Sequence, residues 1–200
     1  MTNTSMTGLK AGFSNPVLSS QAVFRQVLTA MSRPGTLQRI QSLPPAEPPL
    51  LPATAAVCLT LVDFETPLWL DAPLAASNAA GYLRFHCGCP LAAEPVAASF
   101  ALISDPAAMP ALCAFNPGRQ DYPDRSATLI IQVSALAEGE GVRLSGPGIQ
   151  ESARLRVDGL PDRFWAEQEA NRSLFPRGVD LVFTTSDAVA AMPRTTQVES

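Results

Sequence analysis

The sequence of 200 residues has little lysine, histidine or charge. Lys10 is the only lysine, and it lies in an N-terminal segment that we expect to be loose. A pyridoxal-phosphate enzyme needs a lysine for its Schiff base, so the chain is not expected to be one. His86 is the only histidine and there is no Gly-x-Ser-x-Gly motif, which leaves little room for a Ser-His-Asp triad.

Other absences bear on location and partners. No run of about 18 uncharged apolar residues occurs, so no membrane span is expected. The first ten residues lack the apolar core of a signal peptide, which predicts a cytoplasmic protein. The net charge is −4 and no basic patch recurs at close spacing, so nucleic acid is not an expected partner.

The composition is rich in apolar residues, with 46% hydrophobic and 16% charged residues. It argues against disorder and suggests that part of the surface is reserved for partners. The length suits one globular domain with a substantial core. We expect residues 1–12 to form a flexible tail and residues 13–200 a single domain.

Four cysteines are present: Cys58, Cys87, Cys89 and Cys113. We expect free thiols, with Cys58 and Cys113 buried in their apolar stretches. The segment His86–Cys89 could be a soft metal site or a thiol nucleophile with its base, or it could be the end of a helix with His86 near the last carbonyls. The ligand set is incomplete, so we favour the helix end and expect no metal.

The first third of the chain predicts one helix, one short strand and a connector. A helix capped by Ser19-Ser20 is indicated by apolar residues at helical spacing, namely Val23, Phe24, Val27, Leu28 and Met31. Arg33-Pro34-Gly35 ends it, and a strand over 36–40 follows. Five prolines within 43–52 predict an extended connector over the surface.

The rest of the chain alternates between helical and strand patterns. Helices are predicted over 53–62, 74–85 and 106–115, and from Pro161 through Leu174. Strands are predicted over 99–104, 127–133, 142–144, 155–157, 179–184 and 189–192, with 69–70 as an edge strand or loop. The pattern favours an α/β fold, a three-layer α/β/α sandwich, with the hairpin around Gly146 making the sheet mixed. Pro147 removes a backbone donor, so 146–148 indicates a turn rather than a phosphate loop.

Thirteen arginines carry nearly all the positive charge. Four of them stand beside a proline or in a distinctive block, and with the histidine they are the candidate interface or anion-binding residues: Arg33, Arg84, His86, Arg177 and Arg194. One interpretation is an anion site for a phosphonate or a nucleotide phosphate. We favour the other, salt bridges and interface contacts, because anchored arginines commonly serve interfaces. Catalytic residues cannot be assigned.

Five blocks in order carry a family resemblance: Thr66–Leu70, Leu83–His86, Leu144–Ile149, Phe175–Leu181 and Met192–Glu199. Together they resemble the PhnH family of the bacterial carbon–phosphorus lyase system, from about Phe13 to Glu199. Cys87 and Cys89 match no motif of that family.

The resemblance implies a core related to that of pyridoxal-phosphate-dependent transferases without the cofactor, and no cofactor of its own. It also implies a homodimer that docks onto the J subunit, in a complex with G, I and J. That complex forms α-D-ribose 1-methylphosphonate 5-triphosphate from ATP and methylphosphonate, and this chain would support assembly or substrate retention without catalysis.

Two alternatives remain open at this point. The chain could be a self-contained phosphonate- or nucleotide-binding enzyme, with an arginine-lined cleft and His86 or Cys87 as the reactive group. It could also be a binding module for nucleotide phosphates.

Overall fold

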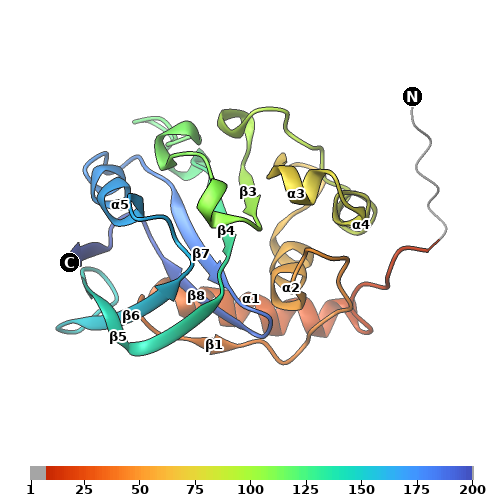
Figure 1. The fold of residues 1–200 in the computed structure, drawn as a ribbon, viewed down its shortest axis with the longest axis horizontal. Coiled ribbons are helices and arrows are strands. Elements are labelled where there is room, and N and C mark those ends of the chain that lie inside the picture. The colour runs from red at the N-terminus through yellow and green to blue at the C-terminus, as the bar shows by residue number, and fades with distance from the viewer. Residues whose placement is uncertain (1–7, 200) are drawn as a thin grey trace.

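The computed structural model describes residues 8–199, so the first seven residues of the expected tail lie outside the described part (Figure 1). The helices are α1 Pro16–Ser32, α2 Pro52–Leu61, α3 Ala72–Ala75, α4 Asn78–Cys87 and α5 Phe164–Arg172. The strands are β1 Gln38–Arg39, β2 Leu68–Leu70, β3 Phe100–Ile103, β4 Thr128–Gln132, β5 Ala135–Ser145, β6 Ala153–Asp158, β7 Asp180–Thr184, β8 Ala188–Met192 and β9 Gln197–Glu199. Single 3-10 turns occur at η1 Pro95–Ala97, η2 Pro106–Ala108, η3 Leu112–Ala114 and η4 Pro123–Arg125.

A mixed six-stranded sheet forms the centre, with the strand order β1-β8-β7-β4-β3-β2. Strands β2, β3, β4 and β7 run parallel, whereas β8 is antiparallel to β7 and β1 is antiparallel to β8. The predicted α/β class with a mixed sheet is confirmed. The reason given for it was wrong, because the hairpin around Gly146 is not part of this sheet. It pairs as β5 and β6 with β9 in a separate antiparallel sheet.

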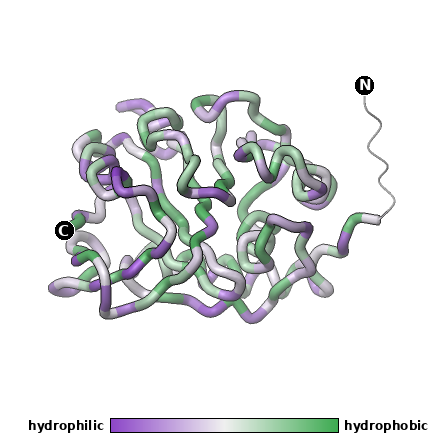
Figure 2. Tube along the Cα trace, in the orientation of Figure 1, coloured by the Kyte–Doolittle hydropathy of each residue, from purple (hydrophilic) through white to green (hydrophobic). Residues whose placement is uncertain are grey.

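Each face of the central sheet has its own core, because successive side chains of a strand point to opposite faces. Leu102, Ile130 and Val182 pack with residues of α1, α2 and α4. Their neighbours on the other face pack with α5, the 3-10 turns and the small sheet. The second covering layer is therefore part helix and part sheet (Figure 1). The central strands carry mostly the hydrophobic colour in Figure 2.

Helix α1 starts earlier than predicted, and its cap is Asn15 rather than Ser19-Ser20. The Asn15 side chain accepts a hydrogen bond from the backbone N–H of Leu18 at 3.2 Å, and Pro16 occupies the first helical position. Asparagine is among the strongest N-cap residues and proline is favoured directly after it, so this pair outcompetes the serines. Ser19 lies buried inside the helix. The predicted end at Arg33 is confirmed.

Two predicted helices are broken. The one over 74–85 is divided into α3 and α4 at Ala76 and Ser77, because the Ser77 hydroxyl accepts from Ala79 N at 3.2 Å and caps a new helix. The one over 106–115 consists of two 3-10 turns, with Pro110 between them. Proline lacks the N–H that a continuous helix needs, and it restricts the residue before it.

The remaining predictions place the other elements well. The helix over 53–62 and the strands over 36–40, 99–104, 127–133, 179–184 and 189–192 are confirmed within a few residues, and 69–70 belongs to edge strand β2. Leu174, expected in α5, lies beyond its end, and β9 was not predicted. No helix in residues 8–199 is long and apolar enough to cross a membrane.

The proline-rich connector 43–52 contacts the N-terminal segment that was expected to be loose. Lys10 N donates to Glu47 Oε1 at 2.8 Å, and Lys10 Nζ donates to the Ala46 carbonyl at 2.6 Å. Ala46, Glu47 and Leu50 of the connector are buried, so this stretch is only partly a surface feature. Residues 9–12 thus lie against the body of the protein.

Candidate functional site

Arg194 lies at the most elaborate polar cluster of the described residues. It follows β8, and its guanidinium pairs with Asp180 at the start of β7, the side chains being 14% and 17% exposed. Arg194 Nε donates to Asp180 Oδ1 at 3.1 Å, and Nη2 donates to Asp180 Oδ2. The Arg194 backbone N–H also donates to Asp180 Oδ1, at 2.8 Å. The pair fixes the loop after β8 against β7.

The other Arg194 donors bind two further segments. Nη1 donates to the carbonyls of Pro123, at 2.8 Å, and Pro176, at 3.3 Å, while Nη2 also donates to Ser126 Oγ at 2.6 Å. A guanidinium has five N–H donors, and all five are engaged with protein acceptors here. Arg194 therefore has no donor left for a phosphonate or phosphate, and its geometry favours the structural interpretation.

The end of α4 carries two more candidates, Arg84 and His86. His86 lies in the last turn of the helix, as predicted, and its Nε2 is 3.0 Å from the Lys10 carbonyl. Its ring packs on Tyr82, with ring centroids 4.5 Å apart. Arg84 is exposed on the same helix. His86 thus holds the N-terminal segment in place, which restricts its use as a reactive group.

Arg33 and Arg177 lie elsewhere. Arg33 is the exposed residue that ends α1, beside the turn of the small sheet. This turn lies so close to the end of α1 that a Cβ on Gly148 would be 2.1 Å from the Ser32 carbonyl oxygen. Arg177 is half-buried, and within residues 8–199 its guanidinium has no hydrogen bond or ion pair. Of the five candidates it is the one next to the Arg194 cluster, through Pro176.

The five candidates thus occupy three places in the fold and do not converge on one cleft. Arg84 and His86 lie at the end of α4, Arg177 and Arg194 near the start of β7, and Arg33 at the end of α1. None of them lines the pocket described next. Sequence spacing could not show this, because contacts between elements depend on how they pack.

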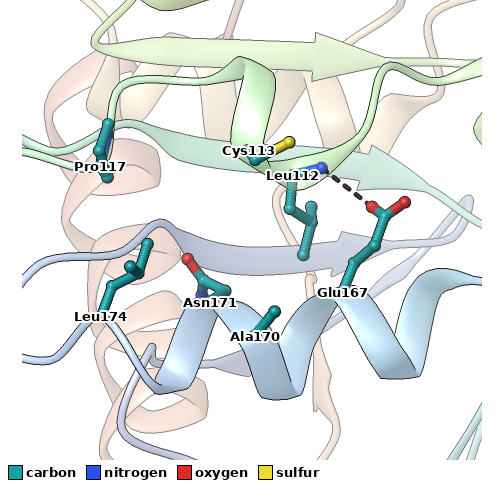
Figure 3. Close-up of a pocket in the computed structure, with 7 residues that line it drawn as sticks. All are labelled: Leu112, Cys113, Pro117, Glu167, Ala170, Asn171 and Leu174. Carbon is teal, nitrogen blue, oxygen red and sulfur yellow. Dashed lines mark hydrogen bonds between the residues drawn. The ribbon is translucent and has the colours of Figure 1, made fainter.

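A small pocket, the α5 pocket, lies between η3 and α5 (Figure 3). It encloses about 270 Å³ and is lined by Leu112, Cys113, Pro117, Glu167, Ala170, Asn171 and Leu174. The volume is slightly below the usual range for small-molecule sites. Cys113 is exposed here, so the prediction that it is buried was wrong, whereas Cys58 is buried as predicted.

The polar groups of the α5 pocket are already engaged in holding its walls together. Glu167 Oε2 accepts from Leu112 N at 2.9 Å, as Figure 3 shows, and Oε1 accepts from Arg163 Nε at 2.7 Å. The Asn171 side chain bonds both backbone groups of Val179. What remains accessible is mainly apolar, which suits an apolar side chain better than a phosphate.

The cysteines, the possible metal ligands and Lys10 bear on whether the chain carries a reactive thiol or a metal. All four cysteines are free thiols, as predicted. Among residues 8–199 no three His, Cys, Asp or Glu side chains are grouped so that they could hold a metal ion. Lys10, the only lysine, is bonded to the Ala46 carbonyl through its ammonium group.

An exposed apolar surface on α1, here the α1 face, was missed by the sequence reasoning. It comprises Val17, Leu18, Phe24 and Leu28, which are 78%, 62%, 50% and 55% exposed. Phe24 and Leu28 were predicted to belong to one stripe with Val23 and Val27, but only the latter two are buried. The signal was present, because the apolar positions cover a wider arc than one core-facing stripe requires.

The geometry thus defines a mixed-sheet α/β protein with an arginine cluster used for its own structure, a small apolar pocket and an uncovered apolar helix face. A family model described as bacterial phosphonate metabolism protein (PhnH) matches residues 11–199. The chain belongs to the PhnH family, and the resemblance drawn from the five sequence blocks is confirmed.

Two curated relatives are similar over most of the chain. The chain is 41% identical over 187 residues to the α-D-ribose 1-methylphosphonate 5-triphosphate synthase subunit PhnH of Rhizobium meliloti (strain 1021), covering 94% of both chains. It is 34% identical over 178 residues to the putative C-P lyase subunit protein HtxG of Stutzerimonas stutzeri, covering 89% of this chain and 85% of that one.

Proposed function

We propose that this chain is a subunit of the carbon–phosphorus lyase core complex, the α-D-ribose 1-methylphosphonate 5-triphosphate synthase, in phosphonate catabolism. Membership of the PhnH family and the names of both relatives support the assignment. The single structural observation that carries it is the α1 face, because large apolar side chains on one helix are costly to leave in water.

The α1 face has properties that suit a second copy of the chain. Val17, Phe24 and Leu28 are spaced by seven and four residues, so they lie on one side of the helix. Arg25 is the only charged residue of α1, so little charge would be desolvated. A two-fold axis would place this patch against itself and double the apolar area buried, toward the roughly 800 Å² per partner of a standard interface. We therefore assign homodimerisation to this face.

Docking onto another lyase subunit is assigned to the α5 pocket and its rim. Leu174 lines the pocket and Phe175, the next residue, is 65% exposed. Phe175 is the first residue of the block Phe175–Leu181 that resembles the family, and Leu174 directly precedes that block. An apolar side chain of a partner fits a pocket whose polar atoms are already bonded. The expected partner is the J subunit, with G and I in the same complex.

A supporting rather than catalytic role agrees with the arginine geometry. Arg194 has all five donors engaged, and His86 holds Lys10. The likeness of the core to that of pyridoxal-phosphate-dependent transferases, a single domain over 13–200 and a cytoplasmic location belong to the same proposal.

The test is size-exclusion chromatography with light scattering, on this chain alone and co-expressed with the G, I and J subunits. We expect a dimer alone and one joint particle with the others. The double variant Phe24→Asp with Leu28→Asp should be monomeric, because two-fold pairing would bury four carboxylates. The double variant Leu174→Asp with Phe175→Asp should stay dimeric but lose the joint particle.

Phe64→Asp is the matched control, since Phe64 is 72% exposed and lies outside both surfaces. It should change neither assembly, and circular dichroism should show that all variants keep their helices. A wild-type chain that stays apart from G, I and J would contradict the proposed function. Assembly lost only with Phe64→Asp would leave the function standing and overturn both surface assignments.

A further inference from the structure

Three of the four cysteines gather where α4 ends. Cys87 is the last residue of the helix, Cys89 follows one residue later, and Cys58 of α2 lies beneath them. The Cys87 thiol points toward the Cys58 carbonyl at 3.7 Å, and the Cys89 thiol toward the Leu83 carbonyl at 4.0 Å. The two thiols thus lie at the junction of α4 and α2.

Gly88 brings the two flanking cysteines together. It ends α4 in the left-handed conformation, with φ +69° and ψ +5°, and donates its N–H to the Arg84 carbonyl. The chain turns sharply there instead of extending. Residues two apart in a turned chain fall within the Cα separation of roughly 4.4–6.8 Å that a disulfide spans.

The two thiols shift each other's pKa in opposite directions. Contact with the Cys87 thiol lowers the pKa of Cys89, and the charge of Arg84 acts in the same direction. The same contact with Cys89, followed by burial, raises the pKa of Cys87. Burial, followed by the nearby Cys89, raises the pKa of Cys58, which keeps that thiol protonated and inert.

We propose that Cys87 and Cys89 form a peroxide-reactive thiol pair that closes reversibly to a disulfide. The Cys89 sulfur attacks one oxygen of hydrogen peroxide, the O–O bond breaks, and the departing oxygen leaves as water after taking a proton. The Cys87 sulfur then attacks the resulting sulfenic acid, and its oxygen leaves as a second water. The two sulfurs lose two electrons in total and the peroxide gains them.

We assign a small oxidant because the Cys89 sulfur is hardly accessible from solvent. Cys89 is only 3% exposed, so a bulky disulfide such as oxidised glutathione cannot approach it, whereas peroxide is close to water in size. Cys87 is half-buried and next to it, ready to resolve the sulfenic acid before further oxidation. Neither thiol is used by the proposed subunit function, so this modification site stands independently of it.

Differential alkylation tests the pair. The full chain carrying Cys113→Ser, which removes the exposed thiol, is treated with hydrogen peroxide and then with N-ethylmaleimide in denaturant, and is digested with trypsin. Arg84 separates Cys58, in the peptide 40–84, from Cys87 and Cys89, in the peptide 85–119. We expect the peptide 85–119 to lose both labels and two hydrogens, and to regain both labels with dithiothreitol.

Other outcomes overturn the proposal. Full labelling after peroxide would show that the thiols do not react, and a cross-link between the two peptides would make Cys58 the partner. With Cys87→Ser, dimedone added together with denaturant should trap a sulfenic acid on Cys89. With Cys89→Ser, the other thiol should stay labelled and free of dimedone. Cys58→Ala should leave the pair unchanged. The alkylation of the Cys113→Ser chain leaves Cys58, Cys87 and Cys89 intact. It therefore tests the disulfide even if one of the further variants fails to fold.

Discussion

The Arg194 cluster and the α1 face differ in how far their side chains are already partnered within the chain. Around Arg194 every guanidinium donor has a protein acceptor, and the ion pair with Asp180 is largely shielded from water. On the α1 face, Val17 and Phe24 are at least half exposed. One region is complete within the chain and the other is not.

The difference shows where to look for function in a protein with few reactive groups. The most distinctive polar residue of the sequence stabilises the fold, because a desolvated guanidinium is tolerated only when its donors are satisfied. The surface left for a partner is apolar, and in the sequence it resembles part of the core.

Arg194→Ala should lower the free energy of unfolding by about 3–5 kcal/mol, because it leaves the largely shielded Asp180 carboxylate without the guanidinium. Arg194→Lys should recover only part of this loss, since an ammonium cannot serve the four acceptor groups now bound by the planar guanidinium. Urea denaturation followed by tryptophan fluorescence measures both values.

The matched control is Arg156→Ala, which removes two ion pairs, with Glu140 and with Asp158; the three side chains are 45%, 59% and 44% exposed. It should cost about 0–1 kcal/mol, because water screens exposed pairs. Equal losses for Arg156→Ala and Arg194→Ala would remove the distinction between the cluster and the surface.

Val27→Ala and Leu28→Ala compare the two sides of α1 at adjacent positions. Val27 is 5% exposed, so the change should cost about 2 kcal/mol for the lost methyl groups and the cavity. Leu28→Ala should stay within about 0.5 kcal/mol in the monomer, because the side chain contacts mainly water. The measurement is denaturation at a concentration where light scattering shows monomers.

The order should reverse in the dimer, where Leu28→Ala weakens association and Val27→Ala does not. Light scattering over a dilution series measures this. If Leu28→Ala destabilised the monomer as much as Val27→Ala, the α1 face would be part of the core rather than a free surface.

Tyr82 gives a small effect at neutral pH, and one that depends on pH. Burial, followed by the nearby Cys87, Cys58 and Glu47, raises the pKa of Tyr82 to about 12, from 10.0. The fold favours the neutral phenol, so this contribution is present below pH 10 and is lost as the pH rises from 10 to 12.

Tyr82→Phe has no proton to lose, so its stability should fall less than that of the wild type over this pH range. At neutral pH it should cost about 0.5 kcal/mol, because the bond from the Tyr82 hydroxyl to the Ala11 carbonyl is long, at 3.4 Å. Urea denaturation at a series of pH values measures both effects. Parallel curves for the two proteins would show that Tyr82 does not titrate in this way.

Much of the fold could be predicted from local patterns. The apolar run Leu129-Ile130-Ile131 predicted β4, and the stretch around Leu181 predicted β7, because strands buried on both faces read as continuous apolar runs. The breaks in the predicted helices over 74–85 and 106–115 were missed. The Ser77 side chain caps a new helix with one hydrogen bond, and Pro110 removes a backbone N–H donor, and apolar periodicity reveals neither.

The candidate site was less predictable. Arg194 and Asp180 were both in noted blocks, but their pairing depends on the turn that makes β8 antiparallel to β7. The α5 pocket joins η3 and α5, more than 50 residues apart in the chain, and no motif marks it. The Phe24 side chain was assigned to the core because one helix sequence does not show how wide a face its neighbours will cover.

The α/β class, most strand positions, the free thiols and the family could be read from the sequence, because they depend on local patterns and on an ordered set of motifs. Three features emerged only from the packing of the whole chain: the hairpin forms its own sheet, Arg194 is fully bonded, and one side of α1 stays uncovered. Each of these depends on contacts between segments far apart in the chain, whose free energy no single segment encodes.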